Sequence, residues 1–225
     1  MKKIIIILIT ALSVYSINAQ NINWQSIDKD QKNIVYLNFG YDFGMTTQFG
    51  CGRKIETFRP ILLTADYSMP MGKDLVDDFK LRIGGQISIF EWKYFRASAK
   101  IYRIFRRHQT KLVRMVSFGS EAAVIVGYYK PKWHIAGEFG FDKSIVTHLK
   151  HSDIMKDNFP AIADGWFIPS GGHFYYGIQG SKTIGNNFDL SLRVGMTNAQ
   201  FNDKNAIMPF YGQFGLIYKI SSKNE

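Results

Sequence analysis

The residue types best suited to catalysis lie close together in the sequence FDKSIVTHLKHSD. This stretch contains Asp142, Ser144, His148, His151 and Asp153. Catalysis by a serine nucleophile needs a histidine within hydrogen-bonding distance and a carboxylate that orients the histidine. Ser144 and His148 share one face of an extended strand, but at about 3.3 Å per residue they lie about 13 Å apart. The spacing therefore argues against a Ser-His pair.

A metal site is the second chemistry that this stretch suggests. His148, His151 and Asp153 can approach a metal ion where the strand ends, but a His-x-x-His spacing in such a segment is a weak signal. Cys51 is the single cysteine, so neither paired cysteine ligands nor an internal disulfide is available. The sequence also contains no glycine-rich phosphate loop. We therefore predict no catalytic site, no metal site and no cofactor, and we expect a protein that is not an enzyme.

A basic segment is the most informative chemical feature of this chain, whose formal net charge is +10. From Trp92 to Ser120 there are eight Lys or Arg residues and no Asp or Glu. These residues are Lys93, Arg96, Lys100, Arg103, Arg106, Arg107, Lys111 and Arg114. Such a run can bind nucleic acid or other phosphates. The compartment in which the protein resides decides between these ligands.

The first twenty residues, MKKIIIILITALSVYSINAQ, predict export from the cytoplasm. Two lysines precede an apolar run from Ile4 to about Val14, which is too short to span a bilayer as a helix. Ile17 and Ala19 occupy the positions that signal peptidase reads, so we expect residues 1–19 to be cleaved. Because an exported protein does not meet nucleic acid in its compartment, we expect the basic segment to have another partner.

The rest of the chain shows the period-two alternation of half-buried β-strands. In FDLSLRVGMT, Leu190 and Leu192 share one face, whereas Asp189 and Arg193 share the other. The segments IVYLNFGYDF, KLRIGGQISI, WHIAGEFGFD and FYGQFGLIYKI follow the same rule. We predict about ten antiparallel strands between residues 33 and 220, or eight if the first two form one long bent strand. No apolar segment beyond the signal approaches the length of a spanning helix.

The composition of the two faces predicts which solvent each one meets. The polar face mixes glycine with charges of both signs, among them Asp42, Asp66, Arg82, Glu138, Asp142 and Arg193. The interior of a barrel of eight to ten strands is just wide enough to be filled by side chains, and opposite charges can pair there. The apolar face recurs in almost every strand, and lipid would cover it. A soluble barrel of lipocalin type, with the apolar face inward around an apolar ligand, is the structural alternative.

Aromatic residues at two short turns favour the membrane. Trp92 and Tyr94 surround one turn, and Tyr128, Tyr129 and Trp133 surround another. Tyr and Trp are typical of the membrane–water interface, although aromatic residues also suit strands in general. The two turns together predict one aromatic girdle.

With its export signal, alternation, short turns and girdle, the chain resembles the small outer-membrane β-barrel proteins of Gram-negative bacteria over roughly residues 33–220. The resemblance implies an antiparallel up-and-down transmembrane barrel in the cell outer membrane, with both termini in the periplasm. Residues 20–32 would then be a periplasmic segment and residues 221–225 a C-terminal tail. The chain departs from the family in one respect, since members often end on an aromatic residue used in assembly, whereas this chain ends in SSKNE.

The lengths of the connections predict a topology, because outer-membrane barrels have short periplasmic turns and longer external loops. We expect periplasmic turns at residues 91–93, 130–132 and 182–187. We expect external connections at residues 106–111, 151–171 and 198–208. Segment 151–171 is the longest, and loops of this length are commonly functional or disordered. It is therefore the candidate for binding an extracellular partner.

A register for the basic hairpin follows if its tip lies between His108 and Gln109. Arg96 then lies opposite Glu121 on the lumen side and forms an ion pair with it. Arg103 lies opposite Arg114 on the lipid side, where like charges directly opposite each other are destabilising. The phosphates of lipopolysaccharide would relieve this repulsion, since guanidinium groups bind phosphate bidentately.

We therefore hypothesise a lipopolysaccharide-phosphate patch on the basic hairpin. The residues of this patch are Arg103, Arg106, Arg107, Lys111 and Arg114. Arginines that merely extend toward headgroup water are the simpler alternative.

These observations predict a barrel with a structural or binding role. Its external loops would contact lipopolysaccharide or a surface partner, and its other partner would be outer-membrane lipid. A diffusion pore is disfavoured, because charged inward side chains should fill a barrel of this size. The functional alternative is an outer-membrane barrel enzyme that acts on lipid or peptide.

Overall fold

The computed structural model describes residues 22–23, 26–27, 31–42, 44–71, 77–201 and 209–221. The strands are β1 (Asn33–Tyr41), β2 (Met45–Ile55), β3 (Ile61–Pro70), β4 (Phe79–Trp92), β5 (Phe95–Gln109), β6 (Val113–Lys130), β7 (Trp133–His151), β8 (Gly165–Phe167), β9 (His173–Ile184), β10 (Phe188–Ala199) and β11 (Phe210–Ile220). One short helix, α2 (Asp153–Asn158), precedes β8. The predicted signal peptide, Phe43 and residues 222–225 of the predicted tail lie outside the described residues.

Ten of these strands form a closed antiparallel barrel. Sequence neighbours pair around the sheet, β7 pairs with both β6 and β9, and β1 pairs with β11 to close the ring. β8 is an extra strand on the upper part of β7. β1 and β2 are separate strands that pair with each other, so the barrel has ten strands rather than eight. The predicted all-β up-and-down architecture is confirmed.

The barrel is polar inside and apolar outside. In β10, Asp189 and Arg193 are buried in the lumen, and the apolar residues between them face outward as predicted. Large apolar side chains on the outer wall stay strongly exposed, such as Ile101 at 60% and Phe139 at 56%. Water would make such a surface costly, whereas hydrocarbon covers it. The protein is an outer-membrane β-barrel.

No helix in the described part of the chain is long and apolar enough to span a membrane. Helix α2 has six residues, and none of them is buried.

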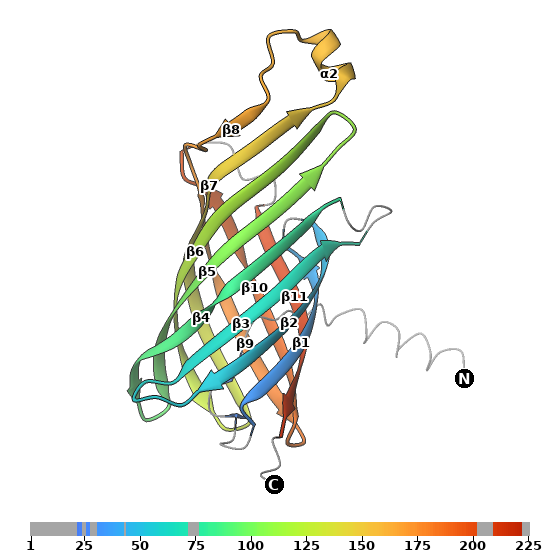
Figure 1. The fold of residues 1–225 in the computed structure, drawn as a ribbon. Coiled ribbons are helices and arrows are strands. Elements are labelled where there is room, and N and C mark those ends of the chain that lie inside the picture. The colour runs from blue at the N-terminus through green and yellow to red at the C-terminus, as the bar shows by residue number, and fades with distance from the viewer. Residues whose placement is uncertain are drawn as a thin grey trace, which may run out of the picture.

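The two ends of the barrel differ, as Figure 1 shows. Turns 93–94, 131–132 and 185–187 gather at one end, close to the sites predicted for periplasmic turns. At the other end β6 and β7, with 18 and 19 residues against nine in β1, extend beyond the neighbouring strands and carry α2 and β8. Because short turns face the periplasm in such barrels, we call these the periplasmic and the external end.

The girdle prediction is confirmed for four of its five aromatic residues. Trp92, Tyr94 and Trp133 are exposed near the periplasmic turns, and Tyr128 packs against Tyr94 and Trp133 with ring centroids 5.5 and 5.7 Å apart. Tyr129 was assigned wrongly, since it is 1% exposed and points into the lumen. The alternation of the strand explains this, because adjacent residues face opposite sides.

Inward glycines make room for tyrosine rings. A Cβ atom on Gly140 would lie 2.3 Å from the ring of Tyr175, and one on Gly50 would lie 2.1 Å from the ring of Tyr36. Neither distance is compatible with van der Waals contact. The glycines of the polar face therefore serve packing within a narrow lumen.

The register predicted for the β5–β6 hairpin is wrong. Arg96 lies opposite Gly127, and Arg103 lies opposite Ser120, so neither predicted cross-strand pair exists. The turn lies further along the chain, where the amide of Val113 donates to Oγ1 of Thr110 at 3.1 Å. The segment read as a charged tip, residues 106–109, continues the strand.

The periplasmic end of the lumen contains an apolar cluster and holds part of the N-terminal segment. Ile34, Leu62, Ile125 and Ile217 form an inward cluster with Tyr36, Tyr129 and Ala136, against which Ile22 packs. Asn23 is fully buried and donates to the carbonyl of Lys130 at 2.7 Å. Ser26 donates to Asp189 at 2.9 Å. The described residues of segment 20–32 thus contribute to closing this end of the barrel.

Candidate functional site

A continuous set of polar contacts crosses the middle of the lumen. Each of the ten barrel strands contributes one side chain, and every one of these is at most 6% exposed. These residues, which we call the lumen network, are Asn38, Gln48, Asp66, Arg82, Lys100, Glu121, Glu138, Tyr175, Arg193 and Tyr211. Three cationic side chains are balanced by three carboxylates, so the network carries no formal net charge.

Ion pairs and hydrogen bonds link the members of the lumen network. Arg82 donates to Asp66 at 2.9 Å and to Glu121 at 3.3 Å. Lys100 lies 3.4 Å from Glu121 and 3.6 Å from Glu138, which also pairs with Arg193. Buried charges of this kind are tolerated only when they are paired.

The hydroxyl-bearing and amide members complete the lumen network. Tyr175 donates to Glu121 at 2.5 Å, and Tyr211 donates to Glu138 at 2.7 Å. Gln48 accepts from Asn38 at 2.7 Å and donates to Asp66 at 2.5 Å. These bonds join the carboxylates of the charged core to the remaining strands.

Arg96 and Glu121 both face the lumen as predicted, but they do not pair with each other. Arg96 pairs with Glu91 near the periplasmic turn, whereas Glu121 pairs with Arg82 and Lys100. The shifted hairpin register separates them by six residues along the strands. Their shared face was predictable from alternation, but their partners depended on the position of the turn.

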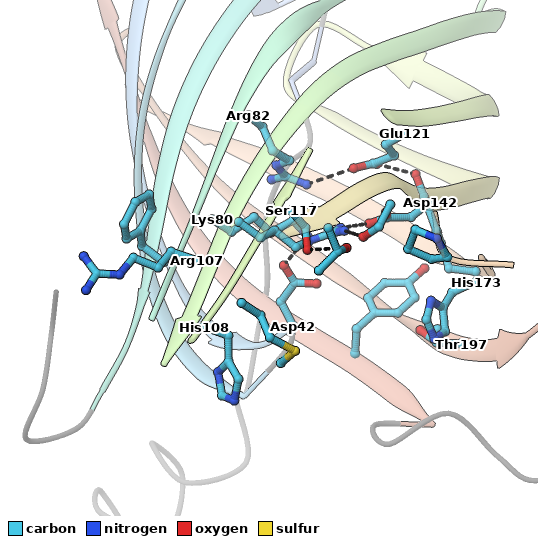
Figure 2. A pocket seen from close by; sticks show the side chains of 18 of the residues that line it. Asp42, Lys80, Arg82, Arg107, His108, Ser117, Glu121, Asp142, His173 and Thr197 are labelled. Carbon is cyan, nitrogen blue, oxygen red and sulfur yellow. Dashed lines mark hydrogen bonds and ion pairs between the residues drawn. The ribbon is translucent and has the colours of Figure 1, made fainter. Parts of the chain in front are cut away.

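Above the lumen network, the external end of the barrel contains a cavity of about 540 Å³ (Figure 2). Its lining combines charged residues with aromatic ones, and Pro169 and Gly171 of the long external connection also border it. Lys80 pairs with Asp42 at 2.8 Å, and Arg106 pairs with Asp142. Arg82 and Glu121 form part of the cavity wall and belong to the lumen network below. The cavity therefore opens outward and ends on a floor of paired charges.

Asp42, one of the acidic residues that line the cavity, stays ionised. Burial raises the pKa of Asp42, but the charges of Lys80 and Arg82 outweigh burial and lower it to about 2. The pair between Asp42 and Lys80 is therefore charged at any physiological pH.

The residues first considered for catalysis do not converge. Ser144 lines the cavity and accepts from Arg106 at 3.4 Å. A β-bulge beside Ile145 shifts the alternation of the strand, so His148 faces outward whereas Ser144 faces the lumen. His148 packs against Trp166 with ring centroids 4.9 Å apart. The prediction that Ser144 and His148 share a face is therefore wrong.

The residues considered for a metal site are also separated. His151 contacts Asp164 at 2.9 Å, and Asp153 begins α2. Among the described residues, no group of three His, Cys, Asp or Glu side chains is arranged to hold a metal ion.

The external segment that follows β7 presents apolar side chains to solvent. Ile168 is 83% exposed and Ile154 is 64% exposed, and Phe159, Trp166 and Phe167 are also exposed. Isolated apolar residues are normal at a surface, but five exposed ones within fifteen residues exceed this, and we call these five side chains the apolar patch. We call segment 152–168 the external segment.

Specific bonds hold the external segment in place. Asp164 accepts from the backbone amide of His151 at 2.7 Å and pairs with Lys156 at 2.6 Å. These two hydrogen bonds, first that from Lys156, hold the pKa of Asp164 well below its usual value. Trp166 and Phe167 continue the sheet beside β7. The patch is therefore built on defined secondary structure.

The five residues of the hypothesised lipopolysaccharide patch do not lie on one surface. Arg106 faces the lumen, whereas Arg107 extends away from the other labelled side chains in Figure 2 and contacts Asp77 at 3.4 Å. Arg103 and Arg114 face outward at different heights, and Lys111 is exposed in the turn. The pairing of Arg103 with Arg114 that motivated the hypothesis is wrong, and lipopolysaccharide binding stays a prediction.

Comparison with known proteins finds no sequence relative. No protein-family model matches the chain, and no curated protein matches it. Among solved structures, similar ones are a KdgM porin in complex with disordered oligogalacturonate, at a TM-score of 0.41, and a KdgM porin, at 0.40. Each is 8% identical in sequence, with coverage of 83% of this chain and 99% of the porin chain. Similarity at this level carries no functional information.

Proposed function

We propose that this protein is a sealed outer-membrane barrel that acts as a binding module at the cell surface. The observation that carries the proposal is the burial of the lumen network. An open aqueous pore would leave inward side chains accessible to water, yet a polar side chain from every barrel strand is at most 6% exposed. With the lumen filled, the external end is the part of the molecule that can meet a ligand.

The external segment supports a recognition role. Its apolar patch is held by the bonds of Asp164 and by pairing with β7, so it offers a preformed surface. Preformed surfaces lose less conformational entropy on binding. The partner that fits this patch is a protein or peptide with an apolar contact surface.

Conductance across planar bilayers tests whether the barrel is sealed. We expect the purified protein to produce no stable current steps, because the buried side chains of the lumen network would block the passage of ions. A general diffusion porin reconstituted in the same bilayers is the control for insertion. Regular current steps from this protein would overturn the proposal and favour a channel.

Photo-crosslinking in intact cells tests the recognition surface. A photoreactive residue in place of Ile168 should give a discrete adduct, and the same residue in place of Lys111, exposed in another external turn, should not. Adding Ile154→Ser should weaken the adduct. Equal labelling at both positions would contradict a specific surface on the external segment.

A further inference from the structure

The lipid-facing wall of β5–β7 changes from apolar to basic between two neighbouring rows of the strand register. Above the periplasmic girdle, the outward residues of these strands are apolar or glycine up to a row formed by Ile101, Ala122 and Phe141. The next row consists of Arg103, Ser120 and Lys143. These two cations are the first charges on this wall above the girdle.

The side chains of Arg103 and Lys143 point outward. Arg103 is exposed, and its neighbours Tyr102 and Ile104 are buried in the lumen. Lys143 lies between Asp142 and Ser144, which both line the internal cavity. Since alternate residues face opposite sides, Lys143 faces the outer surface.

The row lies at the height of the outer headgroups. From Trp133 to Phe141, a strand that rises about 3.3 Å per residue and tilts by about 40° climbs about 20 Å. The apolar band of an outer-membrane barrel is about 25 Å tall. Arg103 and Lys143 therefore lie at its outer edge, where the lipids carry their phosphate groups.

The protein supplies no counter-charge on this wall. The acidic residues of β5–β7 are Glu121, Glu138 and Asp142, and all three face the lumen. None of the ion pairs among the described residues includes Arg103 or Lys143. Two like charges on alternate strands lie about 10 Å apart, so they can share one anionic ligand.

A second pair of cations continues the wall outward. Arg114 on β6 lies directly opposite Lys150 on β7, and both are exposed. Like charges in this position are destabilising unless an anion lies beside them. Arg114 thus lies opposite Lys150 of β7 rather than opposite Arg103 of β5, and this pair is also on the outer face of the barrel.

Aromatic rings lie immediately above the first basic row. Phe105 and Phe118 follow it in register, with ring centroids 5.0 Å apart, and Trp166 lies 6.3 Å from Phe118. Flat aromatic surface beside a phosphate level suits the apolar faces of sugar rings. From the membrane outward, this wall presents apolar, then basic, then aromatic side chains. A phosphorylated glycolipid presents acyl chains, phosphate and sugar in the matching order.

We propose that Arg103 and Lys143, with Arg114 and Lys150 further out, form a binding site for lipopolysaccharide, the phosphorylated glycolipid of the outer leaflet. Arg103 and Lys143 bind phosphate at the edge of the apolar band, and the outer pair contacts anionic groups further from the bilayer. The four cations of this site lie on β5–β7, outside the external segment, so their binding of phosphate does not depend on whether that segment binds a partner.

Retention of lipopolysaccharide during purification in mild detergent tests the site. We expect Arg103→Ser/Lys143→Ser to retain at least about tenfold less than the wild type, because two charge-assisted contacts are lost. Lys132→Ser/Lys182→Ser removes two cations at the periplasmic end and is the matched control, which should retain the wild-type amount. Heat-modifiable gel mobility verifies that each variant is folded.

Titration in nanodiscs identifies the group that is bound. Wild-type protein should bind phosphorylated lipid A, bind its dephosphorylated form at least about tenfold more weakly, and show no competition by millimolar inorganic phosphate. If Arg103→Ser/Lys143→Ser does not fold, Arg103→Gln/Lys143→Gln provides the same comparison. Equal retention by both double variants and the wild type, or equal affinity for both lipids, would overturn the proposal. Retention and affinity are measured independently of conductance, so the failure of this proposal can be distinguished from the failure of the proposed sealed barrel.

Discussion

At the scale of single residues, Glu121 shows how the lumen is held closed. Its carboxylate receives a hydrogen bond from Tyr175 and pairs with Arg82 and Lys100, all within the lumen network. Removing one partner of a buried ion pair strongly destabilises a protein, because the other charge stays buried without its partner. This holds even where the intact pair contributes little net stability. The lumen network is therefore sensitive to the loss of any one charge.

Glu121→Gln tests this sensitivity. We expect the free energy of unfolding in lipid vesicles to fall by about 3–5 kcal/mol, the usual cost of breaking a buried pair. Equilibrium unfolding in urea, followed by tryptophan fluorescence, measures it.

Glu91→Gln is the matched control, because Glu91 also pairs with an arginine but its side chain is 46% exposed. Its effect should be below about 1 kcal/mol. Equal effects for the two substitutions would contradict the burial of the lumen network.

At the scale of elements, the β5–β6 hairpin shows what the sequence reveals and what it hides. Alternation correctly placed Arg96 and Glu121 inside and Ile101 outside. It placed the turn wrongly, because Arg-Arg-His-Gln is a polar cluster typical of a turn. In the structure these residues stay in the strand, since Arg106 pairs with Asp142 inside and Arg107 pairs with Asp77 at the rim. Such partners lie far away in sequence, so no local pattern reveals them.

The β-bulge in β7 is a second irregularity that the sequence did not reveal, and it affects the candidate catalytic residues. One extra residue near Ile145 shifts the alternation, so each later side chain of β7 lies on the opposite side of the sheet from the side expected without the bulge. The sequence contains no glycine or proline at this point to signal the irregularity. The separation of Ser144 from His148 was predicted from distance, but their opposite facing was not predictable.

The external segment should respond to acid through Asp164. Its pKa is lowered by bonds from Lys156 and His151, so the charged form stabilises the segment. This stabilisation is complete above the unfolded pKa of about 4 and is lost as pH falls toward the lower folded value. We expect Trp166 to show constant fluorescence from pH 7 to pH 5 and a change below about pH 4.

Asp164→Asn provides the comparison for this experiment. The variant should show at neutral pH the fluorescence that the wild type reaches in acid, and it should lack the acid transition. An unchanged transition in the variant would assign the response to another group.

At the scale of the whole molecule, the structure places polar groups inside and apolar groups outside, the reverse of a soluble protein. This distribution was predictable because every strand repeats it, from Phe39 and Asn38 in β1 to Leu216 and Gln213 in β11. The burial of part of the N-terminal segment against the barrel was not predicted. The residues that hold this segment, such as Asn23, are isolated in the sequence and form no periodic pattern that would predict their burial.

Cys51 allows the most direct test of this account. The thiol is on the outer wall of β2, between Val35 and Ala65, and is exposed in the isolated chain. In a lipid nanodisc, hydrocarbon should shield it from a membrane-impermeant maleimide until heating in detergent unfolds the barrel. Ser170→Cys in a Cys51→Ser background is the control, because position 170 is exposed at the external end and should react at once. We predict almost no labelling of Cys51 in the folded protein, and labelling as rapid as that of the control would contradict the assignment of the outer wall to lipid.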